Sequence, residues 1–164
     1  QLAPIRSFLN GRLKMDEVDG NEYPPHNPDG DKICFVESPG ETCFLGGDAR
    51  LNQSPDLSII HIFYIREHNR LADILSKLNP QWSDEKVFQE ARRINIAQYQ
   101  HVVYYEWLPL FLGEEQMREG KLIYHKSGSE YVNDYDATIN PAALNEHSAS
   151  AFRYYHSSIE GRLE

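Results

Sequence analysis

The sequence has no long apolar run, few basic residues and few cysteines. No apolar stretch among its 164 residues approaches the roughly 18 residues that a membrane-spanning helix requires. Lys and Arg together number 16, against 25 Asp and Glu, and the net charge is −9. Because contacts with phosphate groups need a basic surface, this charge argues against a nucleic-acid-binding protein. The start of the chain shows no basic and apolar leader, so we expect no signal peptide in it.

Signatures of several enzyme classes are absent as well. The chain contains no Gly-x-Ser-x-Gly nucleophile elbow, no phosphate-binding glycine-rich loop and no dinucleotide-binding fingerprint. His61 and His68 fall on one face of an expected helix, but no third ligand accompanies them at the spacing of a zinc helix. The sequence therefore gives no support to a hydrolase, a nucleotide-binding protein or a zinc enzyme.

The residues that are present describe one mainly α-helical domain. A chain of 164 residues has the size of a single domain, and its 40% hydrophobic residues suffice for a core.

Cys34 and Cys43 flank the turn-forming stretch 37–40. On the residues alone, a disulfide and a pair of free thiols are equally open, and a disulfide would indicate an oxidising compartment.

The clearest local signals belong to a helix over residues 55–78. Ser54 can cap this helix, and Pro55 suits its first position, where a missing N–H costs nothing. Asn79-Pro80 then ends it. The apolar residues at helical spacing are Leu57, Ile60, Tyr64, Leu71, Leu75 and Leu78. We therefore expect an amphipathic helix with this stripe facing a core.

The other elements are expected to be shorter or less regular. Further helices are expected at 84–106, 114–119 and 145–159. Leu108-Pro109 is expected to end the first of these, and Asn145 to cap the last, which carries His156 on an apolar face. Residues 1–48 are rich in Pro and Gly and predict a long irregular segment. Within it, only a helical turn at 7–13 and a strand at 33–36 are expected.

Three motifs give the sequence a resemblance to a known family. Gly47-Asp48-Ala49-Arg50 precedes the expected helix that carries Arg66-Glu67-His68-Asn69, and Phe152-Arg153-Tyr154-Tyr155-His156 lies near the C-terminus. On these residues the chain is identified as a member of the animal haem peroxidase superfamily, similar to peroxinectins and arthropod peroxidases. The resemblance implies a helical, central fragment of the animal haem peroxidase fold, with residues 1–164 as one partial domain.

The resemblance implies roles for Arg50 and His156 on opposite sides of a haem b group. In the family, the Arg of Gly-Asp-x-Arg lies over the distal haem face, where a guanidinium stabilises the negative charge that develops on peroxide as its O–O bond splits. His156 matches the family's proximal His, whose neutral imidazole binds the haem iron. Without the resemblance, Arg50 is interpreted as a surface salt bridge and His156 as a packed core residue.

Other family features are altered here or not found. Gln53 stands where many members have a Glu that forms an ester with a haem methyl; an amide cannot form that ester, so the resemblance implies a contact at the haem edge without a covalent link. We find no distal His segment, do not assign that role to His26, and find no calcium loop. The Asn that orients the proximal His does not occur before Glu164. A recurring family disulfide implies a bond between Cys34 and Cys43.

The segment Arg66-Glu67-His68-Asn69 is a family hallmark that we interpret as structural. Four consecutive polar residues point around a helix, so some of them must face the interior. Buried charges need partners. A salt-bridged network is therefore favoured over a direct chemical role.

The resemblance implies a haem-dependent peroxidase that reduces hydrogen peroxide and oxidises small electron donors such as phenols or halides. The expected partners are peroxide, a small donor, and the rest of the peroxidase domain or a second chain. The cysteine pair and the family together imply a secreted protein that takes part in the response to oxidative stress. The alternative is a non-catalytic adhesion or interaction module that keeps the helical scaffold.

Overall fold

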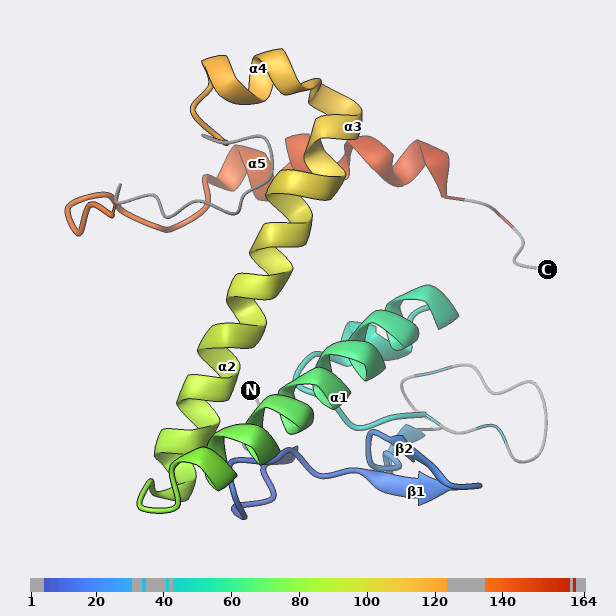
Figure 1. Ribbon diagram of the computed structural model, residues 1–164. Coiled ribbons are helices and arrows are strands. Elements are labelled where there is room, and N and C mark those ends of the chain that lie inside the picture. Colours follow the sequence, from blue (N-terminus) through green and yellow to red (C-terminus); the bar gives the residue numbers. More distant parts are fainter. Residues whose placement is uncertain are drawn as a thin grey trace. The chain divides into compact units, whose positions relative to one another are not determined.

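The computed structural model describes residues 5–30, 34, 41, 43–123, 135–159 and 161. The chain divides into two compact units, residues 1–128 and 129–164, which are described separately below (Figure 1). The first unit contains β1 (Asp16–Val18), β2 (Asn21–Tyr23), η3 (Ala49–Asn52), α1 (Pro55–Leu78), α2 (Asp84–His101), η4 (Val102–Trp107), α3 (Leu108–Leu112) and α4 (Glu114–Glu119). The second contains α5 (Asn145–Ala149) and η5 (Ala151–Ser158). The described residues are thus mainly helical, as predicted.

Helix α1 begins and ends where the local signals predict. The Ser54 hydroxyl accepts a hydrogen bond from the Leu57 N–H, and Pro55 occupies the first turn. At the other end, the Asn79 N–H donates to the Leu75 carbonyl. The predicted apolar stripe is only partly buried: Leu71 lies in the core, whereas Ile60 is 50% exposed.

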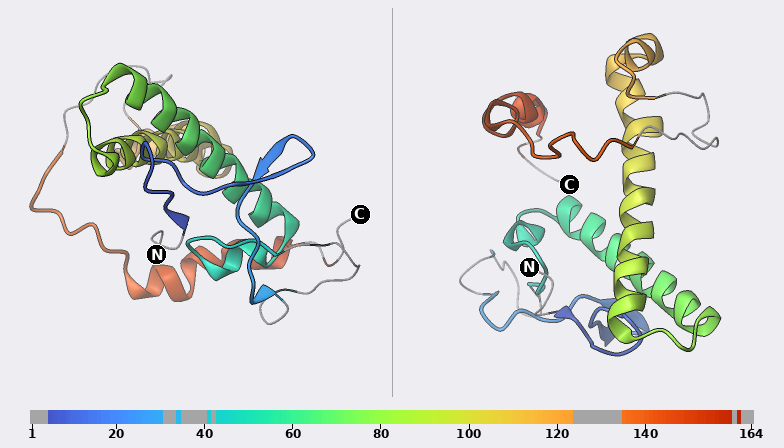
Figure 2. Two further views of the ribbon diagram at one scale, coloured as in Figure 1. Left: turned by 90° about the horizontal axis from the view of Figure 1, so that it is seen from below. Right: turned by 90° about the vertical axis from the view of Figure 1, so that its left-hand side faces the viewer.

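Helices α1 and α2 meet near the 79–83 connection and diverge away from it (Figures 1 and 2). The Ser83 hydroxyl caps α2 by accepting from the Lys86 N–H. Near the joined ends, Leu71, Ala72, Val87 and Ala91 form one buried cluster; farther along, the two helices still touch through the edge-on rings of Tyr64 and Tyr99. The side chains farther along both helices are more exposed because the helices diverge.

The prediction that Leu108-Pro109 breaks the second helix is wrong. The helix passes through the π-helical turn η4 into α3 without leaving the helical region, and the chain turns only at Gly113, whose φ is +80°. The Leu108 N–H still bonds the Val103 carbonyl, five residues back. Pro109 then falls at the start of α3, where the bonding pattern changes and its missing N–H is tolerated. The short helix predicted at 114–119 is present as α4.

The N-terminal segment is more ordered than predicted. β1 and β2 form an antiparallel hairpin in which Asp16 pairs with Tyr23 and Val18 with Asn21. Its turn residues Asp19 and Gly20 have φ values of 51° and 77°, and two positive φ angles are what a type I′ hairpin turn requires. The strands escaped prediction because their side chains are mostly exposed, so no apolar alternation marks them.

Residues 7–13 form a tight turn rather than the predicted helical turn. Arg6 and Leu13 form an antiparallel bridge, and the Ser7 N–H donates to the Arg12 carbonyl over 3.0 Å. The turn presents Ile5 and Leu13 to Ile65 of α1 and Phe88 of α2, and these four side chains form a second buried cluster. The strand predicted at 33–36 lies outside the described residues except for Cys34.

The single helix predicted from Asn145 to Ile159 is also wrong. Asn145 is the first residue of α5 and not its cap, and the helix stops at Ser150, whose φ and ψ are −134° and −68°. A separate 3-10 helix, η5, follows and contains His156. In the described part of this unit no side chain is buried, so no core packing favours α-helical over 3-10 geometry.

Candidate functional site

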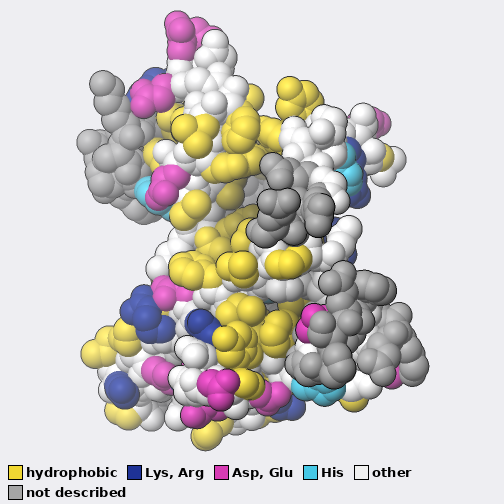
Figure 3. Space-filling model, turned by 90° about the vertical axis from the view of Figure 1, so that its right-hand side faces the viewer, with side chains coloured by type: hydrophobic (Ala, Val, Ile, Leu, Met, Phe, Trp, Pro, Cys, Tyr) yellow, Lys and Arg dark blue, Asp and Glu magenta, His cyan; other side chains and the backbone are white. Residues whose placement is uncertain are grey.

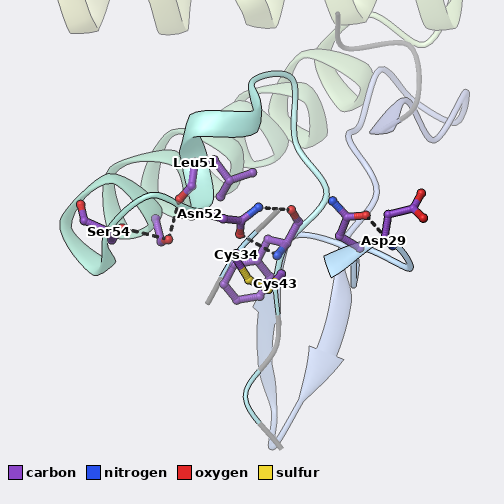
Figure 4. The surroundings of a disulfide bond; sticks show 9 residues. Asp29, Cys34, Cys43, Leu51, Asn52 and Ser54 are labelled. Carbon is purple, nitrogen blue, oxygen red and sulfur yellow. Dashed lines mark hydrogen bonds between the residues drawn. A yellow bond between two sulfur atoms is a disulfide. The ribbon is translucent and has the colours of Figure 1, made fainter. Parts of the chain in front are cut away.

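Arg50 lies in η3, a single turn that joins the disulfide segment to α1 (Figure 4). Cys34 and Cys43 are disulfide-bonded, with their Cα atoms 6.4 Å apart. Asn52 accepts from the Phe44 N–H and donates to the Phe44 carbonyl, both over 2.8 Å. The segment that follows the disulfide is thereby tied to the turn that carries Arg50.

The same turn is anchored from its apolar side. Leu51 is fully buried, and its carbonyl accepts a hydrogen bond of 2.6 Å from the Ser58 hydroxyl of α1. With Leu51 pointing inward, its neighbours on the turn point to solvent: the Arg50 side chain is 69% exposed, and Gln53 is exposed as well. The Gln53 N–H donates to the Arg50 carbonyl over 2.9 Å, which keeps the two residues on one turn.

Both carboxylate oxygens of Asp48 accept hydrogen bonds from the Arg50 guanidinium. Oδ1 accepts from the Arg50 Nε–H over 2.9 Å and Oδ2 from Nη2 over 2.6 Å. These hydrogen bonds hold the pKa of Asp48 well below its ordinary value and raise the pKa of Arg50. Both groups therefore stay charged. A guanidinium has five N–H donors; the pair uses two of them and leaves three for a ligand.

His156 is exposed in η5, where its backbone carbonyl accepts from the Ile159 N–H. Arg50 and Gln53 belong to the first unit and His156 to the second. Their predicted convergence on one haem group therefore stays a prediction.

The hallmark segment of α1 is structural, as predicted, although its partners are mostly backbone groups. His68 is buried, and its Nε2–H donates to the Gly11 carbonyl over 2.9 Å. Asn69 accepts from the Leu13 N–H over 2.7 Å and donates to the Leu13 carbonyl over 3.0 Å. Burial lowers the pKa of His68, which keeps its imidazole neutral. These bonds attach the N-terminal segment to α1.

Arg66 and Glu67, the first two residues of the hallmark segment, make hydrogen bonds at the protein surface. Arg66 donates from Nε to the Glu22 carbonyl over 2.7 Å, and Glu67 accepts two bonds of 2.7 Å from Arg70. Only the Glu67–Arg70 pair matches the salt bridge that the sequence predicts. This segment therefore holds the fold together, and the sequence shows the polar residues but not the backbone groups that they bind.

An open groove of about 450 Å³ runs between the diverging parts of α1 and α2. It is lined by Leu13, Leu57, Ile60, His61, Tyr64, Ile65, His68, Arg92, Asn95, Ile96 and Tyr99. Other apolar side chains stay at the surface (Figure 3), and those of α1 include Ile59 and Phe63. Arg50 and Gln53 do not line this groove, so it is separate from the turn that carries these two residues.

The described ranges offer neither a metal site nor a membrane-spanning helix. In the part of the chain that the structure describes, no three His, Cys, Asp or Glu side chains gather closely enough to hold a metal ion. None of the helices there combines the length and the apolarity that crossing a membrane requires.

Known proteins identify the family to which this arrangement belongs. The family model for animal haem peroxidase matches residues 1–164. A peroxidase of Drosophila melanogaster is 50% identical over 166 residues, which are 100% of this chain and 24% of that protein. A chorion peroxidase of the same organism is 44% identical over 160 residues, or 98% of this chain and 19% of that protein. The chain belongs to the animal haem peroxidase family.

A solved structure supports the same conclusion. Peroxidase A from Dictyostelium discoideum matches 93% of this chain with a TM-score of 0.69 and 33% sequence identity. The match covers 27% of that structure's chain. The chain thus spans less than a third of the length of each of these relatives, and it has the helical fold of part of a peroxidase.

Taken one by one, the side chains that the family resemblance assigns to a haem group have suitable chemistry. Arg50 offers unused N–H donors on a side chain that is 69% exposed. His156 offers an exposed imidazole, which is a suitable donor for haem iron. Gln53 is an exposed amide on the same turn as Arg50.

Proposed function

We propose that this chain is part of a haem-dependent peroxidase that reduces hydrogen peroxide and oxidises small electron donors. The observation that carries the proposal is an exposed guanidinium with unused donors, held on an anchored turn, in a chain that matches the peroxidase family over its whole length. Residues 1–164 are proposed to form one partial peroxidase domain. The proposed partners are peroxide, a small donor, and the rest of the domain or a second chain.

Arg50 is proposed to stabilise the charge that develops on peroxide. Haem, when bound, would supply the redox-active iron that the reduction of peroxide requires. The Arg50 guanidinium donates hydrogen bonds to the oxygen on which negative charge grows, and its position on η3 is set before the reaction. Because a guanidinium keeps its protons, Arg50 stabilises this charge and does not act as the base.

His156 is proposed to bind the iron from the opposite side through a neutral imidazole nitrogen, and Gln53 to contact the haem edge by a hydrogen bond without a covalent link. An imidazole ligand needs its second nitrogen to be oriented by a partner. Arg50 and His156 are 106 positions apart in the sequence, so binding one haem group requires distant parts of the chain to converge.

The protein is proposed to act outside the cell, in the response to oxidative stress. The Cys34–Cys43 disulfide supports an oxidising compartment. Two relatives are chorion peroxidases, from Drosophila melanogaster and Aedes aegypti. A non-catalytic adhesion module is the second candidate, and we do not favour it because the relatives compared above carry the name peroxidase.

The test is reconstitution of the purified chain with haemin. We expect a Soret shift that is lost in His156→Ala but kept in His147→Ala, which removes another exposed His of the same unit. We expect peroxide turnover with a phenolic donor to fall about 10²–10³-fold in Arg50→Ala with the Soret band unchanged. Arg70→Ala is the matched control, because Arg70 is also an exposed Arg paired with a carboxylate. Haem uptake that His156→Ala leaves intact would refute the proposed ligand.

A further inference from the structure

Asp48 contacts Arg50 at three points with one carboxylate. Oδ1 accepts from the Arg50 backbone N–H over 2.9 Å and from its Nε–H over 2.9 Å. Oδ2 accepts from Nη2 over 2.6 Å. The first bond makes Asp48 the N-cap of η3. The other two form a fork that defines the plane of the guanidinium.

We propose that Asp48 is a positioning residue for the peroxide reaction, because its carboxylate holds the Arg50 guanidinium in one orientation with its unused N–H donors directed away from the pair. The inference rests on the role proposed for Arg50. The fork occupies the Nε and Nη2 edge of the planar group. Both N–H groups of Nη1 and the second N–H of Nη2 therefore lie along its remaining edges, where an anionic oxygen can accept from them.

Arg50 needs such a restraint. Its side chain is 69% exposed, and no other hydrogen-bond partner for its guanidinium occurs among the described residues. A long exposed side chain loses rotamer entropy when it is fixed. A donor whose orientation is set before the reaction avoids that loss in the transition state.

The carboxylate is itself firmly placed and charged. Asp48 precedes the turn whose Leu51 is fully buried, so its backbone belongs to the anchored part of the segment. Its pKa is held well below the ordinary value, chiefly by the hydrogen bond from the Arg50 side chain. Asp48 and Arg50 are therefore both charged near neutral pH, and the fork is an ion pair there.

Matched variants separate the cap from the fork. Asp48→Ser keeps an oxygen that caps the turn but cannot accept the fork. Asp48→Asn keeps the Oδ1 acceptor and loses the charge. Glu67→Gln is the control, because Glu67 accepts the same kind of two-bond fork, both bonds 2.7 Å, from Arg70 on α1.

The first measurement needs no haem. Hydrogen exchange of the Arg50 Nε–H, followed by NMR on the chain alone, is expected to be slow in the wild type and in Glu67→Gln. We expect it to be fast in Asp48→Ser and intermediate in Asp48→Asn. Equal exchange rates in the wild type and Asp48→Ser would show that the fork does not form, and would overturn the inference without affecting the proposed function.

The second measurement uses the haemin-reconstituted chain. We expect the second-order rate with peroxide to fall about tenfold in Asp48→Ser, less than in Arg50→Ala, while the Soret band and the KM for a phenolic donor stay unchanged. Glu67→Gln should keep the wild-type rate. A wild-type rate in Asp48→Ser, together with a fall in Arg50→Ala, would overturn the positioning role and leave the role of Arg50 standing. No fall in Arg50→Ala would overturn the proposed function and this inference with it.

Discussion

Replacing Asn69 by Leu should detach the N-terminal segment from α1. Asn69 is 1% exposed, and its amide both accepts from and donates to the backbone of Leu13. Leu has the same number of side-chain heavy atoms and branches at the same atom, but it offers no hydrogen bond. The substitution therefore leaves the N–H and the carbonyl of Leu13 without partners in a buried place.

The expected cost follows from those two backbone groups. A buried donor or acceptor left unsatisfied costs about 1–3 kcal/mol. With both groups of Leu13 affected, we expect the free energy of unfolding to fall by about 3 kcal/mol, which is a large share of the stability of a single domain. The nearby cluster of Ile5, Leu13, Ile65 and Phe88 should loosen in consequence.

The assay is urea unfolding followed by circular dichroism, with hydrogen exchange of the Leu13 amide as a local probe. Asn21→Ala is the control, because the Asn21 amide makes only an exposed bond of 3.3 Å and should change stability by less than about 0.5 kcal/mol. A loss below about 1 kcal/mol in Asn69→Leu, with the Leu13 amide still protected, would refute the reasoning.

Three further predictions concern stability. Burial lowers the pKa of His68. The stability that neutral His68 contributes is therefore fully present above its unfolded-state pKa of about 6.5, and it is lost as the pH falls through the lower folded-state pKa. The free energy of unfolding at pH 5–7 measures this loss, and His68→Gln should flatten the profile. Replacing Cys34 and Cys43, which are 9 positions apart, by Ala should cost about 2.5 kcal/mol of chain entropy, measured by urea unfolding. Ser54→Ala should lower the free energy of unfolding by about 1 kcal/mol, measured likewise, because it removes the α1 cap.

Each of these has its own control. His147→Gln, at an exposed His, should leave the pH profile unchanged; an equal flattening there would contradict the role of His68. Ser76→Ala, inside α1 where the hydroxyl bonds the Asp73 carbonyl, should cost less than Ser54→Ala. For the disulfide, a reductant should destabilise the wild type but not the double Ala variant, and the opposite result would rule out a stabilising bond.

The helix boundaries could be predicted where the signals are local. Ser54 and Pro55 act within the first turn of α1, and Asn79 acts at its end. Each of these residues therefore lies next to the helix end that it determines. Gly113 likewise stops α3 through its own φ of +80°. Pro109 misled the prediction because its cost depends on the π-helical turn before it, and no local signal announces that turn.

Burial was harder to predict than helicity. Leu71 and Ile60 belong to one apolar stripe in the sequence, yet Leu71 lies in the core and Ile60 is 50% exposed. The difference arises because α1 and α2 diverge away from their connection (Figure 2). The hairpin of β1 and β2 was missed because its side chains are mostly exposed, so the strands show no alternation of apolar and polar residues.

The sequence by itself determined the family, and with it the identities of Arg50, Gln53 and His156 as the residues proposed to meet a haem group. It also determined most helix ends, since caps and stops act within a few residues of themselves. Only the tertiary structure decided that His68 and Asn69 bind Gly11 and Leu13, and that Asp48 holds Arg50 by its side chain. The physical reason is that every residue except proline carries the same backbone donor and acceptor, so side-chain identity alone does not select a distant backbone partner.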